Sequence, residues 1–455
     1  MTTVTSLGAA SGMDLEGLLT KLMSAESTHL GSLQTQQSTY NSEISAYGQL
    51  KSALDSFNTA TQALQDSWDF NGTTATSSNT TAFTATAADG ASTGTHTVAV
   101  NNLAQQQIQY SKNAAFSSTT TAMGTSTVSG SSSLSGSDTL TFTLAGDSTK
   151  TFSVTANYDT DSLETLKNSI NSASGNTFLT ASILNDGTGN RLVVTAKDTG
   201  LSSGINVSES QSGSPLNFTT SQAAKDASLT VDGIAVTSAS NTVTNVVDGV
   251  TLNLQGTTSS AASLVVAHDV SGITTKVQNF ISAYNNLASA ANTLHKKGAT
   301  LDGENTVTQV ITQLQSVFNT PANISGNSYS YMAQLGISFS KDGTLSLDTS
   351  TFQNALSTNF SQVVSAFTDV KEGFAQRLSQ TATAMMNTNG LLSARIDGLN
   401  TSLTNIGDDI TREQTRLSDV SATYRAQFSA LDTLVGNLNT SLSYISQLTK
   451  STSSS

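Results

Sequence analysis

The chain has 455 residues, too many for one hydrophobic core, and this length predicts roughly two to four domains. Charged residues make up only 11%, the net charge is −13, and no basic cluster exceeds Lys296-Lys297, which argues against nucleic-acid binding because phosphate contacts need clustered Lys and Arg. The absence of cysteine excludes a disulfide framework, thiol catalysis and thiolate metal sites.

The start of the chain carries no recognisable targeting signal. Residues 1–12 contain no basic residue, the first being Lys21, and no apolar core, so we expect no cleavable secretory signal. No run of roughly 18 apolar residues occurs, so we expect no membrane span. If the protein acts outside the cell, it leaves by a route that reads an uncleaved polar N-terminus.

Residues 15–68 have apolar side chains in steps of three and four, which predicts a long amphipathic helix. The period is cleanest from Tyr40 onward, and Glu26 and Gln37 interrupt it before that residue. Trp68 is expected to pack in the core at the end of this helix. The apolar members of the pattern are Leu15, Leu18, Leu22, Leu30, Leu33, Tyr40, Ile44, Tyr47, Leu50, Leu54, Phe57, Leu64 and Trp68.

The period falls to two between residues 73 and 101, which predicts a pair of strands around Phe83 and Val98. Residues 117–138 are rich in Ser, Thr and Gly, and we expect a surface loop there with at most one weak strand.

A compact α+β unit is predicted next. It consists of two strands around a turn at Gly146-Asp147, a helix whose start is signalled by Asp161 and Glu164, and two more strands around a turn at Asn185-Asp186-Gly187. The return from this unit arrives at Ala223.

Further strands are predicted between Ala227 and Val270, and we expect them to share a sheet with the strands before the compact unit, which makes that domain discontinuous. Helical periodicity then resumes. We expect helices at 273–287, 307–318, 352–367 and 374–386, with a hairpin at 337–347 that turns at Asp342-Gly343.

The last predicted helix, residues 391–448, has a heptad pattern with one polar layer at Glu413 and Gln414. At about 1.5 Å per residue it is on the order of 85 Å long, so it needs a partner along its length. The helix at the other end of the chain is the simplest partner. The predicted fold class is therefore α+β multidomain, with long terminal helices that form a coiled-coil stalk and legs, and with β-rich head domains inserted between them.

We predict four domains. They are the terminal leg helices (1–40 and 418–455), a helical stalk domain (41–70 and 271–417), a β-rich inner head domain (71–112 and 224–270) and an outer α+β head domain (113–223).

No residue pattern indicates chemistry. Asp159, Asp161, Asp186 and Asp342 are spaced as turn and cap residues, without a calcium-loop spacing. The four histidines are scattered, which argues against a zinc site and against a catalytic constellation. We therefore expect no metal, no cofactor and no enzyme activity.

Several motifs in the same order resemble the flagellar hook-associated protein 2 family, the filament-capping proteins. The outer unit around Ile170-Asn171 also resembles the short repeat of flagellins and hook-associated proteins. The motifs that carry the resemblance are Ser11-Gly12-Met13-Asp14, Tyr47-Gly48-Gln49-Leu50-Lys51, residues 227–233 (ASLTVDG), residues 280–286 (FISAYNN), Leu335-Gly336-Ile337 and Gln427-Phe428 through Leu431-Asp432.

The resemblance implies a secreted protein of the bacterial flagellum, exported through the flagellar channel to the filament tip. There it implies a homo-oligomeric ring, on the order of five subunits, that helps exported flagellin to fold and insert. Implied partners are other copies of the chain, flagellin, the hook-filament junction protein and an export chaperone at the C-terminus. The implied flagellin or leg contacts are Leu15, Leu18, Leu22, Leu30 and Leu33, and the implied chaperone or oligomer contacts are Phe428, Leu431, Leu438, Leu442 and Ile445.

Two alternatives stay open. One is another protein of the same class, either a hook-filament junction protein or a flagellin. The other is a cell-adhesion function, in which the Ser/Thr-rich, acidic head domains bind host mucin or glycans. The heptad stripes can also serve intrachain packing. We favour intrachain packing for residues 40–68 and a partner surface for Leu15 to Leu33, because the earlier periodicity is too patchy for a stable isolated helix.

Overall fold

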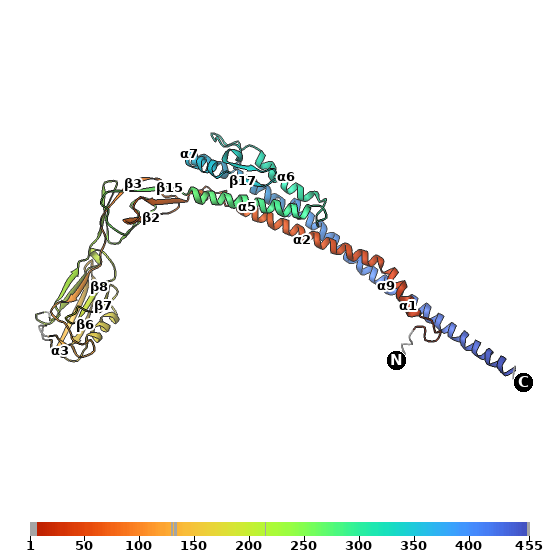
Figure 1. The fold of residues 1–455 in the computed structure, drawn as a ribbon, viewed down its shortest axis with the longest axis horizontal. Coiled ribbons are helices and arrows are strands. Elements are labelled where there is room, and N and C mark those ends of the chain that lie inside the picture. The colour runs from red at the N-terminus through yellow and green to blue at the C-terminus, as the bar shows by residue number, and fades with distance from the viewer. Residues whose placement is uncertain (1–6, 129–130, 132–133, 214, 453–455) are drawn as a thin grey trace. The chain divides into compact units, whose positions relative to one another are not determined.

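In a computed structural model, residues 7–128, 131, 134–213 and 215–452 are described. The chain forms two compact units, one made of both chain ends, Met1–Asp69 and Val270–Ser455, and one of Phe70–Asp269. The predicted fold class is confirmed: long terminal helices pack on each other, and several β-sheets are inserted between them (Figure 1). The four-domain division stays a prediction.

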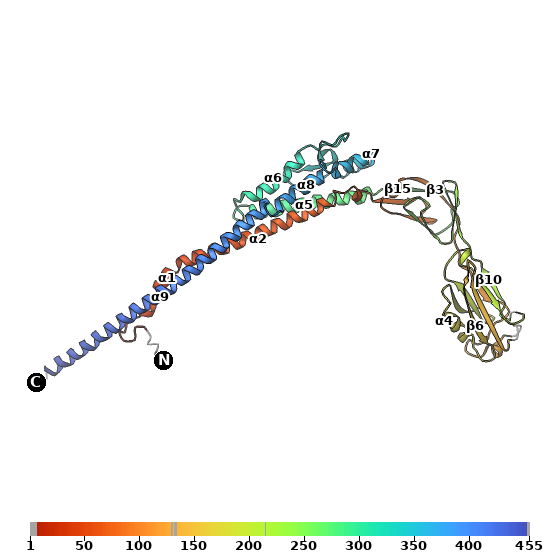
Figure 2. The same cartoon turned by 180° about the vertical axis from the view of Figure 1, so that it is seen from behind.

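The first unit is helical. Both terminal helical regions lie along each other in two opposite views (Figures 1 and 2). The elements of this unit are α1 (Leu15–Glu26), α2 (Thr28–Gln62), η1 (Ser67–Phe70), α5 (Val270–His295), α6 (Asn305–Asn319), η3 (Met332–Leu335), β16 (Ile337–Phe339), β17 (Leu345–Leu347), α7 (Thr349–Thr368), α8 (Phe374–Met386) and α9 (Leu391–Thr452).

The single N-terminal helix predicted from sequence is two helices, because the chain breaks at Ser27. The Ser27 hydroxyl donates to the carbonyl of Ser24 at 3.0 Å, and the Thr28 hydroxyl donates to that of Ala25 at 2.8 Å. Hydroxyls that bond back onto their own helix compete with the backbone and bend it. The break falls beside Glu26, where the apolar period is also interrupted.

Aromatic side chains form the centre of the helical unit. The Phe57 ring of α2 lies 5.5 Å from Phe280 and 5.9 Å from Tyr284, both on α5. Phe318 of α6 packs edge-on against Tyr284 at 5.5 Å. Phe57, Phe280 and Tyr284 are at most 1% exposed, so the second half of α2 is an intrachain core element.

The second unit contains an inner pair of antiparallel sheets that share one apolar core. One sheet has the order β1-β15-β3-β11-β12 and the other β13-β14-β2. The strands are β1 (Thr73–Ser77), β2 (Phe83–Ala87), β3 (Gly94–Asn102), β11 (Ala227–Val231), β12 (Ile234–Ser238), β13 (Thr242–Thr244), β14 (Val250–Leu254) and β15 (Ala262–His268). Strands before and after the outer region thus share sheets, as predicted.

The two strands expected around Phe83 and Val98 are present as β2 and β3, but they do not pair with each other. β2 pairs with β14, whereas β3 pairs with β11 and β15. Phe83 and Val98 are fully buried in the same core, so the two strands belong to sheets that pack face to face.

The outer part of the second unit has two sheets, β10-β4-β8-β7 and β6-β5-β9, around a separate apolar core. The strand β4, which precedes the boundary predicted at residue 112, pairs with β8 and β10 of this part. The elements are β4 (Ile108–Ser111), α3 (Met123–Ser126), β5 (Ser137–Leu144), β6 (Asp147–Asn157), α4 (Leu163–Ser172), β7 (Leu179–Asn185), β8 (Asn190–Ala196), η2 (Leu201–Ser203), β9 (Ile205–Glu209) and β10 (Phe218–Gln222).

Two sequence-based details differ from the structure here. The cap of α4 is Ser162, whose hydroxyl accepts from the Thr165 amide at 3.1 Å, while the Asp161 carboxylate accepts from the Asn157 amide at 2.8 Å. Within the predicted surface loop 117–138, the short helix α3 inserts a fully buried Met123 into the outer core. An apolar anchor therefore fixes part of this Ser/Thr-rich segment.

The expectation that Trp68 packs in the core is wrong, because its side chain is 64% exposed. It lies in η1, a 3₁₀ turn after the end of α2, so it no longer follows the helical period.

We predict that Phe57→Ala lowers the free energy of unfolding of the helical unit by about 3–5 kcal/mol, because it leaves a cavity among fully buried aromatic rings. Trp68→Ala is the matched control and should change it by less than about 0.5 kcal/mol. Denaturant unfolding followed by far-UV circular dichroism measures both. Equal losses for the two variants would contradict the assignment of the core.

Candidate interaction site on the terminal helices

The terminal helices meet along a narrow apolar seam. Leu33 of α2 forms a cluster with Ile406 and Ile410 of α9, and partly buried Leu30, Tyr40 and Leu403 pack against it. Leu392 and Leu399, nearer the start of α9, are at most 2% exposed. The apolar stripes read from the sequence therefore contact each other within one chain over this stretch.

A polar cluster fixes the position of α9 relative to α2 and α6. The Arg395 guanidinium lies 2.7 Å from Glu304 and 3.8 Å from Glu43, and the Tyr47 hydroxyl donates to Glu304 at 2.9 Å. Burial, together with the charge of Glu304, raises the pKa of Glu43 above its ordinary value. One guanidinium thus joins three helices beside the apolar seam.

A second polar cluster joins the interruptions in the two heptad patterns. Arg416 of α9 lies 2.9 Å from the carboxylate of Glu26 and 2.8 Å from that of Glu413. Its hydrogen bonds hold the pKa of Glu413 below the ordinary value. The polar layer of the last helix thus contacts the break in the first helix through Arg416. The sequence did not reveal this contact, because Glu26 and Arg416 are 390 residues apart.

A third contact ties the N-terminal segment to α9. The backbone amides of Ser11 and Ala10 donate to the Asp432 carboxylate at 2.7 and 3.3 Å. Hydrogen bonds from the Ser11 hydroxyl and from the amides of Ser11, Ala10 and Gly8 hold the pKa of Asp432 below the ordinary aspartate value. The residues come from two motifs, Ser11 to Asp14 and Gln427 to Asp432, that were both singled out in the sequence, although nothing in the sequence paired them.

The predicted leg residues are divided between core and surface. Leu15 and Leu33 are buried, at 1% and 9% exposed, Leu22 and Leu30 are half-buried, and Leu18 is 44% exposed. Leu15 and Leu33 are therefore covered by other parts of the chain, Leu33 by Ile406 and Ile410 of α9.

The predicted C-terminal residues are mostly exposed. Tyr424 and Phe428 are half-buried and their rings stack at 6.3 Å. Beyond them, the exposed fractions of Leu438, Leu442 and Ile445 are 54%, 62% and 59%, and Leu431 is 37% exposed. We call Phe428, Leu431, Leu438, Leu442 and Ile445 the C-terminal stripe.

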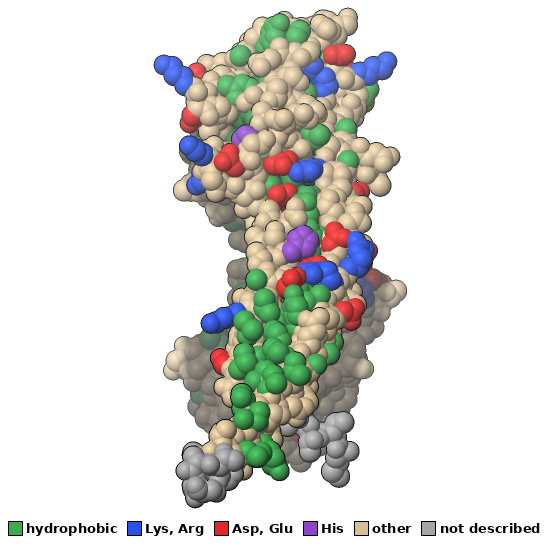
Figure 3. All heavy atoms as spheres, turned by 90° about the vertical axis from the view of Figure 1, so that its right-hand side faces the viewer, with side chains coloured by type: hydrophobic (Ala, Val, Ile, Leu, Met, Phe, Trp, Pro, Cys, Tyr) green, Lys and Arg blue, Asp and Glu red, His purple; other side chains and the backbone are tan. Residues whose placement is uncertain are grey.

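Sequence reasoning missed two further members of this surface, Leu434 and Tyr444, which are 58% and 69% exposed, while Leu448, the last residue of the predicted heptad pattern, is 54% exposed. Figure 3 shows hydrophobic side chains gathered at this end of the helical unit. Residues 433–449 contain no charged residue, so an apolar partner helix could cover this surface without removing a charged group from water.

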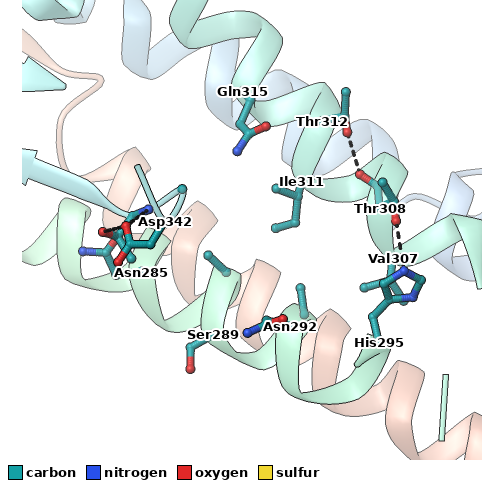
Figure 4. Close-up of a pocket in the computed structure, with 14 residues that line it drawn as sticks. Asn285, Ser289, Asn292, His295, Val307, Thr308, Ile311, Thr312, Gln315 and Asp342 are labelled. Carbon is teal, nitrogen blue, oxygen red and sulfur yellow. Dashed lines mark hydrogen bonds between the residues drawn. The ribbon is translucent and has the colours of Figure 1, made fainter. Parts of the chain in front are cut away.

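A groove of about 540 Å³ lies elsewhere in the helical unit, between α5, α6 and the turn of the β16–β17 hairpin (Figure 4). His295 is held by the Leu301 carbonyl at 3.1 Å and lies 3.4 Å from the Thr308 hydroxyl. Asp342 lies at the other end of the groove and accepts from its own turn at Thr344. The lining residues therefore provide no acid–base pair.

Among the described residues, no group of three or more His and carboxylate side chains could hold a metal ion. Of the helices in the described ranges, none has the length and apolar character to cross a membrane.

Comparison with known proteins gives three family matches. Residues 11–107 match the N-terminus of flagellar hook-associated protein 2, residues 224–440 match its C-terminus, and residues 139–198 match the flagellin hook IN motif. The chain is 33% identical to flagellar hook-associated protein 2 of Escherichia coli K12 over 485 aligned positions, which cover 100% of both chains. The chain belongs to the flagellar hook-associated protein 2 family.

Other members of the hook-associated protein 2 family are also similar to this chain over nearly its whole length. The B-type protein of Pseudomonas aeruginosa PAO1 is 28% identical over 94% of each chain, and the Salmonella typhimurium protein is 28% identical over 98% of each. The crystal structure of the D1-D2-D3 domains of the E. coli flagellar cap protein FliD covers 78% of this chain and 99% of its own, with 32% identity and a TM-score of 0.57. The family consists of structural flagellar cap proteins and not of enzymes, in agreement with the sequence-based expectation.

We predict that Leu438→Ser/Leu442→Ser changes the free energy of unfolding by less than about 0.5 kcal/mol per site, because both leucines are more than half exposed. Leu399→Ala on the same helix should cost about 2–5 kcal/mol, because that side chain is 2% exposed. Chemical denaturation compares them. A large loss in the Ser variant would mean that the stripe is covered within the chain.

Proposed function

We propose that this chain caps the distal tip of the bacterial flagellar filament, where a ring of copies promotes the folding and insertion of exported flagellin. Membership of the cap protein family supports this proposal. The observation that carries it here is the C-terminal stripe, a long, mostly exposed apolar surface on α9, of which residues 433–449 contain no charged residue.

The ring is proposed to contain about five subunits, as closed cyclic assemblies of one chain allow. We propose Phe428, Leu431, Leu438, Leu442 and Ile445 as contacts of the export chaperone or of neighbouring subunits. The other proposed partners are flagellin and the hook-filament junction protein.

Of the proposed leg residues, Leu18 is exposed and Leu22 half-buried, so both are available to flagellin without any separation of the terminal helices. Leu15, Leu30 and Leu33 become available only where the terminal helices separate, because each contributes to intrachain packing or lies against it.

The proposal is tested in a bacterium that lacks its own cap protein. Expression of the wild-type chain should restore swimming and keep flagellin in the filaments. Leu438→Ser/Leu442→Ser should fold but leave flagellin monomers in the medium, with at least a tenfold loss of filament length. The matched control is Leu201→Ser, which changes an equally exposed leucine of the outer domain, at 61%. Wild-type filaments in the double variant would contradict the proposed role of the stripe.

A second candidate function, adhesion to host mucin or glycans through the head, has one supporting observation. Solvent-facing hydroxyls pair across β5 and β6, with Thr139–Thr155, Thr141–Ser153 and Thr143–Thr151 oxygens 3.2, 2.8 and 3.0 Å apart. This uncharged hydroxyl face can donate to and accept from sugar hydroxyls.

A fragment of residues 105–225 tests this function. It includes β4 and β10, which complete the outer sheet, and its ends are joined by the Gln105–Lys225 bridge. The fragment should bind immobilised mucin, and Thr141→Val/Ser153→Val should weaken that binding at least fivefold. Binding that is absent, or unchanged in the variant, would exclude this face as an adhesin, and circular dichroism of each fragment verifies its folding.

A further inference from the structure

Residues 8–26 form a distinct segment on the surface of α9, which we call the N-terminal strap. It consists of a tight turn, residues 8–14, followed by α1. The break at Ser27 separates it from α2, which has no side-chain cap at its start. α9 continues beyond the strap as the helical end that carries the C-terminal stripe (Figures 1 and 2).

The turn at residues 8–14 has a glycine-dependent backbone that places two of its amides against α9. The Gly12 amide donates to the Gly8 carbonyl at 2.9 Å, and Gly8 has a φ of +97°. A Cβ at Gly8 would lie 2.0 Å from the Met13 carbonyl oxygen, so glycine is required there. The turn presents the Ala10 and Ser11 amides to Asp432, which is only 9% exposed.

The strap also approaches α9 closely at a second point, one helical turn further along. A Cβ built on Gly436 would lie 3.0 Å from the Cβ of Ala10, so a small residue at position 436 lets the turn reach the helix. Asp432 and Gly436 together therefore contact the N-terminal turn of the strap.

The middle of the strap is held weakly. Of the twelve residues of α1, only Leu15 and Leu19 are buried. The Glu16–Arg425 pair at 2.8 Å and the Glu26–Arg416 pair at 2.9 Å are both substantially exposed, and exposed ion pairs contribute little stability in water. A helix of this length is marginal by itself, so we expect the contacts of its N-terminal turn with α9 to contribute much of the strap's attachment.

We propose that the N-terminal strap opens and closes on α9 as one body about Ser27, with Asp432 as the latch that holds it closed. Opening separates Leu15 and Leu19 from α9. It also uncovers the stretch of α9 beside Arg425, where Val420, Tyr424 and Phe428 are half-buried in the closed chain.

Opening of the strap would lengthen the exposed apolar surface of α9. The uncovered stretch of α9 continues directly into the C-terminal stripe, so the latch sets whether that surface begins near Val420 or beyond Phe428. Only this use of the uncovered stretch rests on the proposed function; the opening itself is a property of the chain alone.

The test is amide hydrogen exchange on the full chain, without any partner. Asp432→Asn keeps the size of the side chain but removes the carboxylate that receives two amides. It should raise exchange across residues 8–26 together by at least tenfold, while α5 exchanges as in the wild type. Asp419→Asn, an exposed aspartate on the same helix, is the matched control and should leave the strap unchanged.

A reversible closure provides the converse test. The chain contains no cysteine, and the Cβ atoms of residues 10 and 436 would lie 3.0 Å apart, so an outward shift of the turn of about 0.5 Å would reach the disulfide range and let Ala10→Cys/Gly436→Cys form one. The oxidised variant should slow exchange across α1 at least tenfold, and reduction should reverse this.

Three results would overturn the proposal. They are an Asp432→Asn effect confined to residues 8–14, an effect that spreads to α5, and an oxidised variant whose α1 exchanges as fast as in the reduced form. The filament assay of Leu438→Ser/Leu442→Ser is independent of this measurement, so a failed strap and a failed stripe are distinguished.

Discussion

The pairing of α2 with α9 is the interaction on which the rest of the structure depends. It joins residues near the two ends of the chain, and both sheet regions lie between these two helices in the sequence. The seam is apolar but narrow, and Leu33, Ile406 and Ile410 form one small buried cluster within it. Arg395 and Arg416 form polar contacts on either side of that cluster, and the apolar side chains between them pack the two helices together.

Packing declines steadily toward the end of α9. Near Phe57 and Phe280 the helices are enclosed by aromatic rings, around Leu33 they form a two-helix seam, and beside α1 only two leucines of that helix are buried. Beyond Phe428 the large apolar side chains of α9 are exposed. This gradient leaves a tightly packed region at one end of the helical unit and exposed apolar side chains at the other, an arrangement that supports the proposed capping role.

The helices, the discontinuous inner sheets and the fold class could be predicted from sequence, because apolar periods of 3.6 and 2 depend only on local burial. Pairings across long separations could not. The partners of β2 and β3, the Glu26–Arg416 pair and the Asp432 contact with Ser11 join residues whose own neighbourhoods carry no sign of each other. The end of a helix is also hard to predict from periodicity: Trp68 fits the helical period but lies in a turn after the helix has ended. The exposure of Leu438 and Leu442 could not be predicted either. Their apolar heptad pattern is the same as that of the buried residues earlier on α9.

The central claim, that the two ends of one chain pack on each other, is tested most directly by electron spin resonance. Spin labels at Thr35→Cys and Thr404→Cys occupy exposed positions on α2 and α9, flanking the Leu33–Ile406 cluster. The account predicts a short label-to-label distance in the doubly labelled chain that persists when excess unlabelled chain is added before refolding. Loss of the short distance on such dilution would show that the helices pair between chains and would contradict the account.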